Sequence, residues 1–275
     1  RELWITDGTA AGTLMVDDID PGDADSHPTE LTDLSGTLFF VADDGVNGEE
    51  LWKSDGSAAG TVMVKNIDAT AGDGSSPKGL VTTNGRLYFS ANDGVHGRET
   101  WESDGTVAGT VLVADLAPGA RSSSPEWLTD LEGMLYFAAD DGVNGQELWK
   151  SDGTQAGTVL LADIDPSPNA DSFPTRLVGY DGVLYFAAHD GVHGEELWKS
   201  YGTANGTALV EDVNAGAASS EPQEMVKMGN AVYFAARSQN YGTEVWDSLP
   251  EPSGLLGLVS GAALLAWLRK RRQQS

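Results

Sequence analysis

Short apolar runs separated by turn-forming residues follow one another along most of the chain. Runs such as 87–89 and 184–186 are apolar on consecutive positions, a pattern typical of strands that are covered on both faces. Asp-Gly, Asn-Gly and Pro-Gly pairs lie between the runs, and these pairs favour tight hairpin turns. No stretch with a helical period occurs before residue 249. The pattern therefore predicts an all-β chain of short antiparallel strands.

The same pattern returns every 48 or 49 residues. Each period contains four strand-sized segments, which are a Pro-x-x-Leu segment, a Leu-Tyr-Phe run, a Glu-Leu-Trp run and a Gly-Thr-Val run. A meander of four strands in this length has the size of a β-propeller blade. We therefore predict a β-propeller, with a β-solenoid as the alternative, and expect one tryptophan per period to pack between blades. These tryptophans are Trp4, Trp52, Trp101, Trp149, Trp198 and Trp246.

The repeats fill residues 1–248, which we interpret as one propeller domain. Four complete blades are expected, with the last two strands of a blade before them and the first three strands of another after them. Because the chain opens at Arg1, inside a repeat, we expect a fragment or a processed form of a longer protein. The pattern does not decide how many blades would close a ring.

Residues 249–275 stand outside the repeat and form a separate tail. Residues 254–268 carry no charge, and as a helix they would span about 22 Å, which is short of a hydrocarbon core of about 30 Å. This predicts a marginal membrane helix whose basic end stays in the cytoplasm while the acidic repeats stay outside. The basic end consists of Arg269, Lys270, Arg271 and Arg272.

The formal net charge is −26, and four of the 16 basic residues belong to that tail. A chain without a basic face is a poor partner for nucleic acid, because phosphate binding depends on lysine and arginine. The sequence has no cysteine, so no disulfide stabilises it.

Two motifs in the sequence resemble those of known bacterial families. The repeated Glu-Leu-Trp-x-x-Asp-Gly-Thr makes residues 2–248 resemble the ELWxxDGT-repeat family, which implies an extracellular or surface location and no established chemistry. The motif departs at Tyr201, and Arg237 and Ser238 replace paired acids in the last unit. The tail resembles the PEP-CTERM sorting signal of Gram-negative bacteria. That resemblance implies transient membrane anchoring and recognition by an exosortase of Pro250, Glu251 and Pro252.

Candidate chemistry is sparse in the repeats. The chain has no nucleophile elbow, phosphate-binding glycine loop or metalloprotease motif, and most acid pairs recur at the same phase of each repeat, as turn residues do. We therefore expect a non-enzymatic binding or structural module at the cell surface or in an exopolysaccharide matrix, without a certain cofactor. One alternative is a calcium-dependent scaffold that binds the metal through carboxylate oxygens. Its candidate ligands are Asp18, Asp20, Asp23 and Asp25.

The other alternative is a propeller enzyme that acts on polysaccharide, for which the candidate acids are Glu30 and Glu224. Both lie two residues after the proline of the Pro-x-x-Leu segment, which we expect to be the innermost strand of each blade. This position varies between repeats, whereas the next one is apolar from Leu31 onward and is expected in the core. An indole offers a flat face to a sugar ring, so we predict that Trp127 and Arg176 flank a glycan site.

Overall fold

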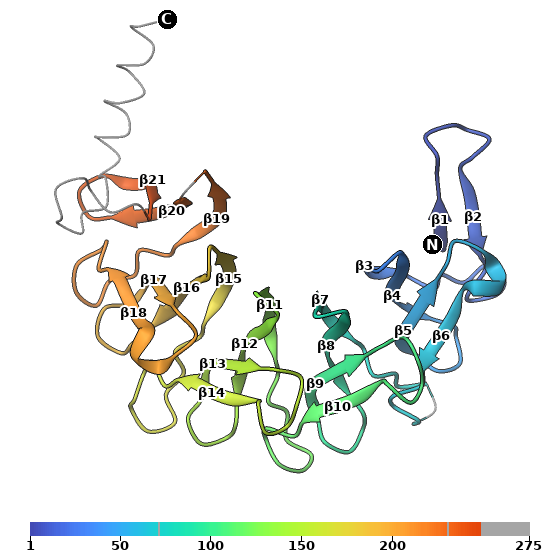
Figure 1. Ribbon diagram of the computed structural model, residues 1–275, viewed down its shortest axis with the longest axis horizontal. Helices are drawn as coiled ribbons and strands as arrows, with labels where there is room; N and C mark the ends of the chain where they lie inside the picture. Colours follow the sequence, from blue (N-terminus) through green and yellow to red (C-terminus); the bar gives the residue numbers. More distant parts are fainter. Residues whose placement is uncertain (71, 230, 249–275) are drawn as a thin grey trace, which may run out of the picture. The chain divides into compact units, whose positions relative to one another are not determined.

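The computed structural model describes residues 1–70, 72–229 and 231–248, which form 21 strands and two short 3-10 helices. Each sheet is an antiparallel meander of strands consecutive in the chain (Figure 1). The first sheet has two strands, β1 (Leu3–Ile5) and β2 (Leu14–Asp17). The second has four, β3 (Thr29–Leu34), β4 (Thr37–Asp43), β5 (Glu49–Ser54) and β6 (Val62–Lys65). The third has β7 (Lys78–Thr83), β8 (Arg86–Asn92), β9 (Arg98–Ser103) and β10 (Val111–Ala114).

The remaining sheets follow the same plan. The fourth contains β11 (Glu126–Leu131), β12 (Met134–Asp140), β13 (Gln146–Ser151) and β14 (Val159–Ala162). The fifth contains β15 (Thr175–Tyr180), β16 (Val183–His189), β17 (Glu195–Ser200) and β18 (Thr207–Glu211). The last described sheet has three strands, β19 (Gln223–Met228), β20 (Ala231–Ser238) and β21 (Gly242–Asp247). The helices are η1 (Ala58–Gly60) and η2 (Ala204–Gly206).

The prediction of an all-β propeller fold built from four-stranded antiparallel meanders is confirmed. The tail helix expected over residues 254–268 lies outside the described residues. Within the described part of the chain, no helix is long and apolar enough to cross a membrane.

The chain divides into two compact units, which are described separately. Unit 1 comprises residues 1–143 and 149–159, and unit 2 comprises residues 144–148 and those from 160 onward. In unit 1 the first strands of three successive sheets, β3, β7 and β11, lie next to one another. In unit 2 the same holds for β15 and β19. Within each unit, the Pro-x-x-Leu strands of consecutive sheets therefore lie side by side.

The repeated tryptophan packs between sheets, as expected, at Trp52, Trp101 and Trp246. Trp101 on β9 belongs to a buried cluster with Phe39 and Leu51 of the preceding sheet, Trp52 to one with Leu3 of the first sheet, and Trp246 to one with Leu197 of the fifth sheet. Trp149 is buried too, whereas Trp198 is half-buried and Trp4 is 58% exposed. The Leu-Tyr-Phe strands supply the largest fully buried side chains, among them Phe40, Phe89, Phe137, Phe186 and Phe234.

The glutamate of the repeated motif is a buried connector. The Glu50 carboxylate accepts hydrogen bonds from the backbone N–H groups of Asp68 and Ser75, both at 3.1 Å, and from the Ser75 hydroxyl at 2.6 Å. It thereby fixes the segment that leads from one sheet to the next. Burial raises the pKa of this carboxyl group, because desolvation outweighs the hydrogen bonds. The equivalent residues Glu2, Glu99, Glu147 and Glu196 also accept from the N–H and hydroxyl of the equivalent serine, and each accepts from the backbone N–H 17 positions later in the chain.

The Asp-Gly-Thr part of the motif builds a tight turn. Asp104 Oδ1 accepts from the backbone N–H and the hydroxyl of Thr106, at 2.9 and 2.7 Å. Gly105 has φ +82°, and a Cβ there would lie 2.8 Å from the Phe39 ring of the preceding sheet. Glycine is needed at this position both for the left-handed backbone and for the close approach of the two sheets.

Candidate functional site

The variable position of each Pro-x-x-Leu segment is a β-bulge. The register of each first strand shifts there against the second strand, and the bulge residue has a left-handed backbone. In two repeats a threonine hydroxyl two residues further on donates to the bulge carbonyl, as Thr129 does to Trp127 at 2.9 Å. The φ values are 56° at Glu30, 66° at Gly79, 58° at Trp127, 57° at Arg176 and 52° at Glu224.

Non-glycine residues seldom adopt this backbone, which costs about 1–2 kcal/mol per residue. All described repeats share it, so the conformation belongs to the scaffold and the side chain at this position can differ between repeats. Sequence reasoning found the variable position but missed the bulge, although the glycine at Gly79 was a signal of positive φ.

In unit 1 the bulges of three adjacent strands form a row, which we call the bulge row: Glu30 on β3, Gly79 on β7 and Trp127 on β11. The Glu30 carboxylate leans toward β7, where it accepts a hydrogen bond from Leu80 N–H at 3.2 Å. Leu128 leans toward β7 from the other side, since a Cβ on Gly79 would lie 3.7 Å from its Cδ1 atom. Gly79 presents no side chain, so the bulge position between the carboxylate and the indole carries backbone only.

The Trp127 side chain is 45% exposed, and the Glu30 side chain is exposed as well. An exposed indole can stack on the apolar face of a sugar ring, and a carboxylate accepts hydrogen bonds from hydroxyl groups. The bulge row therefore has the chemistry to bind a polyhydroxylated ligand across three strands.

The expectation that the residue after the bulge is in the core is wrong for Leu31, which is 57% exposed. Leu177 is buried, the half-buried Leu80 and Met225 pack against buried clusters, and Leu128 is half-buried. The bulge explains the difference: an extra residue breaks the alternation of the strand, so adjacent positions no longer point to opposite faces.

The other two predicted ligand-binding residues lie in unit 2. Arg176 is half-buried and its guanidinium donates to Glu195 Oε1 at 2.9 Å and to the Thr175 hydroxyl at 3.1 Å. Glu224 is exposed on β19. Arg176 and Trp127 thus belong to different units, and their pairing around one glycan stays a prediction.

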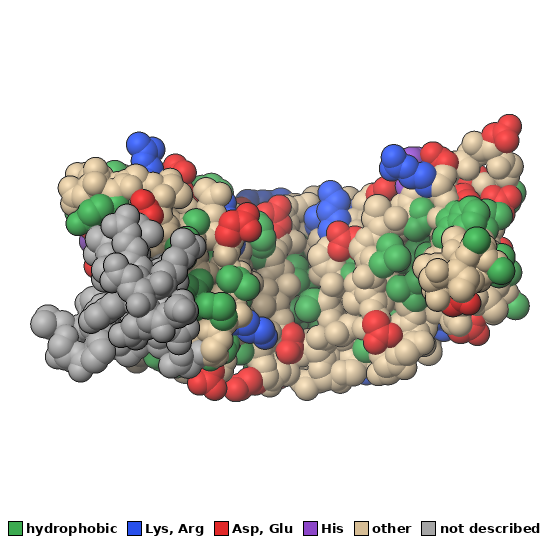
Figure 2. Space-filling view, turned by 90° about the horizontal axis from the view of Figure 1, so that it is seen from above, with side chains coloured by type: hydrophobic (Ala, Val, Ile, Leu, Met, Phe, Trp, Pro, Cys, Tyr) green, Lys and Arg blue, Asp and Glu red, His purple; other side chains and the backbone are tan. Residues whose placement is uncertain are grey.

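The structure does not gather the four aspartates proposed for calcium. Asp18 accepts from Gly22 N–H at 3.3 Å, Asp25 pairs with the amino group of Arg1, and Asp20 lies against Gly45. Acidic side chains are spread over the face in Figure 2. Among the described residues, no three His, Cys, Asp or Glu side chains are placed to hold a metal ion. The sorting residues Pro250, Glu251 and Pro252 and the basic end lie outside the described residues.

No protein-family model and no curated protein sequence matches the chain. Solved structures with a similar fold include oligopeptidase B from Leishmania major, with 10% identity and a TM-score of 0.54 over 92% of this chain and 36% of that one. Puromycin hydrolase matches with 12% identity and a TM-score of 0.44 over 82% and 35%. A gluconolactonase from Xanthomonas campestris matches with 17% identity and a TM-score of 0.42, covering 82% of each chain.

The chain spans about a third of the length of oligopeptidase B and puromycin hydrolase, and at these identities the likeness shows the fold alone. It nevertheless corrects the expectation of a non-enzymatic module. That expectation took a regular β-repeat as evidence against catalysis, whereas the same fold is part of hydrolases. A repeated propeller scaffold is therefore no argument for a non-enzymatic role.

Proposed function

We propose that this chain is a propeller enzyme that acts on polysaccharide, with the glycan held on the bulge row of unit 1. The observation that carries the proposal is the exposed indole of Trp127 on a strand adjacent to β7, where Gly79 carries no side chain, with the exposed carboxylate of Glu30 on the far side.

Each residue of the row has a distinct part. Trp127 supplies a rigid platform on which a sugar ring stacks, and this costs little conformational entropy because an indole has only two side-chain torsions. The absence of a side chain at Gly79 lets the sugar approach the backbone of β7. Glu30, whose Oε2 atom accepts a hydrogen bond from Leu80 N–H at 3.2 Å, accepts further hydrogen bonds from the hydroxyl groups of the sugar.

The proposed location is outside the cell. The resemblance of the repeats to the ELWxxDGT family and of the tail to a PEP-CTERM signal supports export, sorting by an exosortase and transient anchoring by the C-terminal tail in a Gram-negative bacterium. Polysaccharides are abundant substrates in that setting, which is consistent with the enzyme proposed here.

The proposal is tested by measuring the release of new reducing ends from a panel of neutral and acidic polysaccharides. Wild-type protein is expected to release them from at least one polysaccharide. Glu30→Gln keeps the size of the side chain and removes its charge, and we expect it to lower the rate at least tenfold. Absence of release from every member of the panel, or a full rate in Glu30→Gln, would overturn the proposal.

A further inference from the structure

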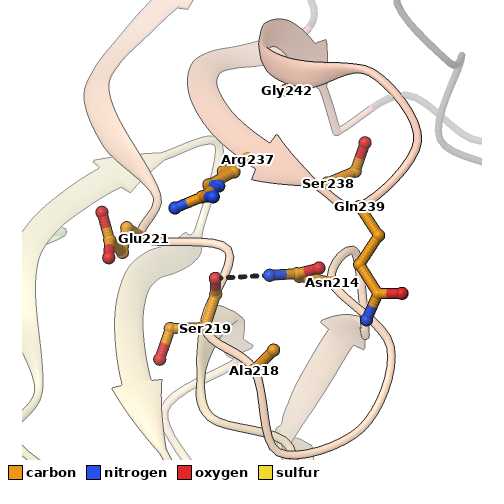
Figure 3. A pocket seen from close by; sticks show the side chains of 8 residues that line it. All are labelled: Asn214, Ala218, Ser219, Glu221, Arg237, Ser238, Gln239 and Gly242. Carbon is orange, nitrogen blue, oxygen red and sulfur yellow. Dashed lines mark hydrogen bonds between the residues drawn. The ribbon is translucent and has the colours of Figure 1, made fainter.

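A second polar site lies in unit 2, at the loops that join β18 to β19 and β20 to β21. It is an open groove of about 500 Å3. Four uncharged polar side chains and one ion of each sign line it (Figure 3), and no aromatic ring takes part. They are Asn214, Ser219, Glu221, Arg237, Ser238 and Gln239.

Asn214 supplies a buried acceptor that has no partner. Its side chain is only 6% exposed, and its Nδ2 donates to the backbone oxygen of Ser219 at 2.8 Å. This bond fixes the orientation of the amide, because a carbonyl oxygen accepts only from the N–H side. The Oδ1 atom points away from Ser219 (Figure 3) and accepts no hydrogen bond within the described part of the chain. A buried polar atom without a partner destabilises the fold, so a hydrogen-bond donor from a ligand would remove that penalty.

Arg237 and Glu221 supply opposite charges to the same groove. Both side chains are exposed, and among the described residues no ion pair joins the Arg237 guanidinium to a carboxylate. A guanidinium without an internal partner presents a planar set of donors that matches a carboxylate in a bidentate manner. Glu221 can accept only from donors such as hydroxyl groups or cations.

The groove is formed where the last unit departs from the repeat. Arg237 stands at the position of Asp43 and Asp140, and Gln239 stands at the position of a glycine such as Gly45. In that earlier repeat the turn is closed by an aspartate, since a Cβ on Gly45 would lie 2.6 Å from Asp20 Oδ1. Asn214 occupies the place of that aspartate. Three changes thus meet at one turn, where a cation and an amide stand in place of two acids and a second amide stands in place of a glycine.

From this geometry we infer that the groove binds a hexuronate, the carboxylate-bearing sugar of acidic polysaccharides. Arg237 binds the ligand carboxylate, while Asn214 Oδ1 and Glu221 accept hydrogen bonds from ring hydroxyl groups. Ser219, Ser238 and Gln239 complete the polar lining. This site does not depend on the bulge row of unit 1, and either can be correct without the other.

The test is calorimetric titration of the full chain with trigalacturonate in 150 mM salt and a chelator. The chelator prevents calcium from bridging the ligand and acidic side chains of the protein. Remote acidic residues are screened under these conditions, because the Debye length is about 8 Å. The comparison ligand is the methyl ester of trigalacturonate, which keeps the hydroxyl groups and loses the charge. The comparison variant is Arg237→Asp, which introduces the residue found in the equivalent turns at Asp43 and Asp140 and is therefore compatible with the fold.

Wild-type protein is expected to bind trigalacturonate, with at least tenfold weaker binding of the ester and at least tenfold weaker binding of trigalacturonate by Arg237→Asp. Arg121→Asp makes the same charge change at an exposed arginine of unit 1 and is expected to leave the affinity unchanged. Equal affinity for acid and ester, or full affinity in Arg237→Asp, would overturn the inference. Loss of binding in Trp127→Ala with retention in Arg237→Asp would also overturn it and would place the uronate on the bulge row.

Discussion

At the scale of single residues, the bulge shows how one backbone geometry carries different side chains. Every described first strand of a four-stranded sheet has a left-handed residue at this point, whether it is an acid, an indole, a guanidinium or a glycine. Glycine adopts this backbone without the steric cost that other residues meet. The scaffold therefore accepts a small energetic cost in the repeats that present a side chain there.

This view predicts opposite effects of two substitutions at equivalent positions. Gly79→Ala adds a Cβ that meets only ordinary contact, 3.7 Å from Leu128, so its expected cost of about 1 kcal/mol comes from the backbone alone. Glu224→Gly removes an exposed side chain at φ 52° and is expected to stabilise the protein by up to about 1 kcal/mol. Denaturant unfolding measures both changes, and a shift of the same sign in the two variants would be incompatible with a shared left-handed bulge.

The buried glutamates predict an unusual dependence of stability on pH. Burial raises the pKa of Glu147 and of Glu196 to about 7 in the folded protein, from an ordinary 4.5. A raised folded-state pKa gives a stabilising contribution that is complete below about pH 4.5 and is lost as the pH rises through 7. The melting temperature is therefore expected to rise by several degrees when the pH is lowered from 8 to 5.5.

The variant Glu147→Gln serves as the control for that measurement. It cannot titrate, so the melting temperature should vary less with pH than in wild-type protein, although it is lower at pH 5.5 because the amide cannot accept all three hydrogen bonds. An unchanged pH slope in Glu147→Gln would show that the general repulsion of a chain with net charge −26 causes the effect instead.

At the scale of elements, the Asp-Gly-Thr turn is the best-defined local structure in the repeat. Its aspartate accepts two hydrogen bonds from the residue two positions later, as at Asp55 and Ser57. Tyr201 replaces the aspartate in one turn, where Thr203 still accepts from Gly206 N–H at 3.1 Å and Lys199 lies 5.7 Å from the tyrosine ring. The turn survives the loss of its acid because the threonine cap remains.

Exchanging the two residues tests how much the aspartate contributes. Asp104→Tyr loses both bonds to Thr106 and is expected to cost about 1 kcal/mol, the usual value of such a cap. Tyr201→Asp is expected to gain less, because the contact of the ring with Lys199 is lost. Thermal unfolding of both variants measures the two changes in stability. A lower melting temperature for Tyr201→Asp than for wild-type protein would mean that tyrosine stabilises its turn more than aspartate does.

At the scale of the whole molecule, contacts between consecutive sheets within a unit stabilise the fold, since Trp52, Trp101 and Trp246 each belong to a buried cluster with side chains of the preceding sheet. Trp101 is the clearest case, because it shares a buried cluster with Phe39 and Leu51 and the Lys65 ammonium lies 5.5 Å from its ring centre. Trp101→Ala is expected to cost about 3–5 kcal/mol. Trp4→Ala removes a side chain that is 58% exposed and should cost less than half of that in denaturant unfolding. Similar costs for both would contradict packing between sheets as the main source of stability.

The sequence predicts the fold well because the signals are local and recur in every repeat. They are the period of 48 or 49 residues, the residue pairs that form turns and the consecutive apolar positions. The role of Glu50 could not be predicted, because its partners Asp68 and Ser75 are 18 and 25 residues away. The bulge could not be predicted, because a residue other than glycine gives no sign in the sequence that its φ is positive. The groove at Arg237 was visible only as a departure from the motif, and its unpartnered Asn214 oxygen requires the packed structure.

The central claim is that Trp127 holds a glycan on the bulge row. Its most direct test is calorimetric titration of soluble oligosaccharides into wild-type, Trp127→Ala and Trp4→Ala proteins, with oligosaccharides cut from a polysaccharide that releases reducing ends in the proposed assay. Removal of a stacking indole is expected to weaken binding at least tenfold in Trp127→Ala, whereas Trp4→Ala, which also removes an exposed indole from unit 1, should bind as wild-type protein does. Equal affinities of Trp127→Ala and wild-type protein would contradict the claim.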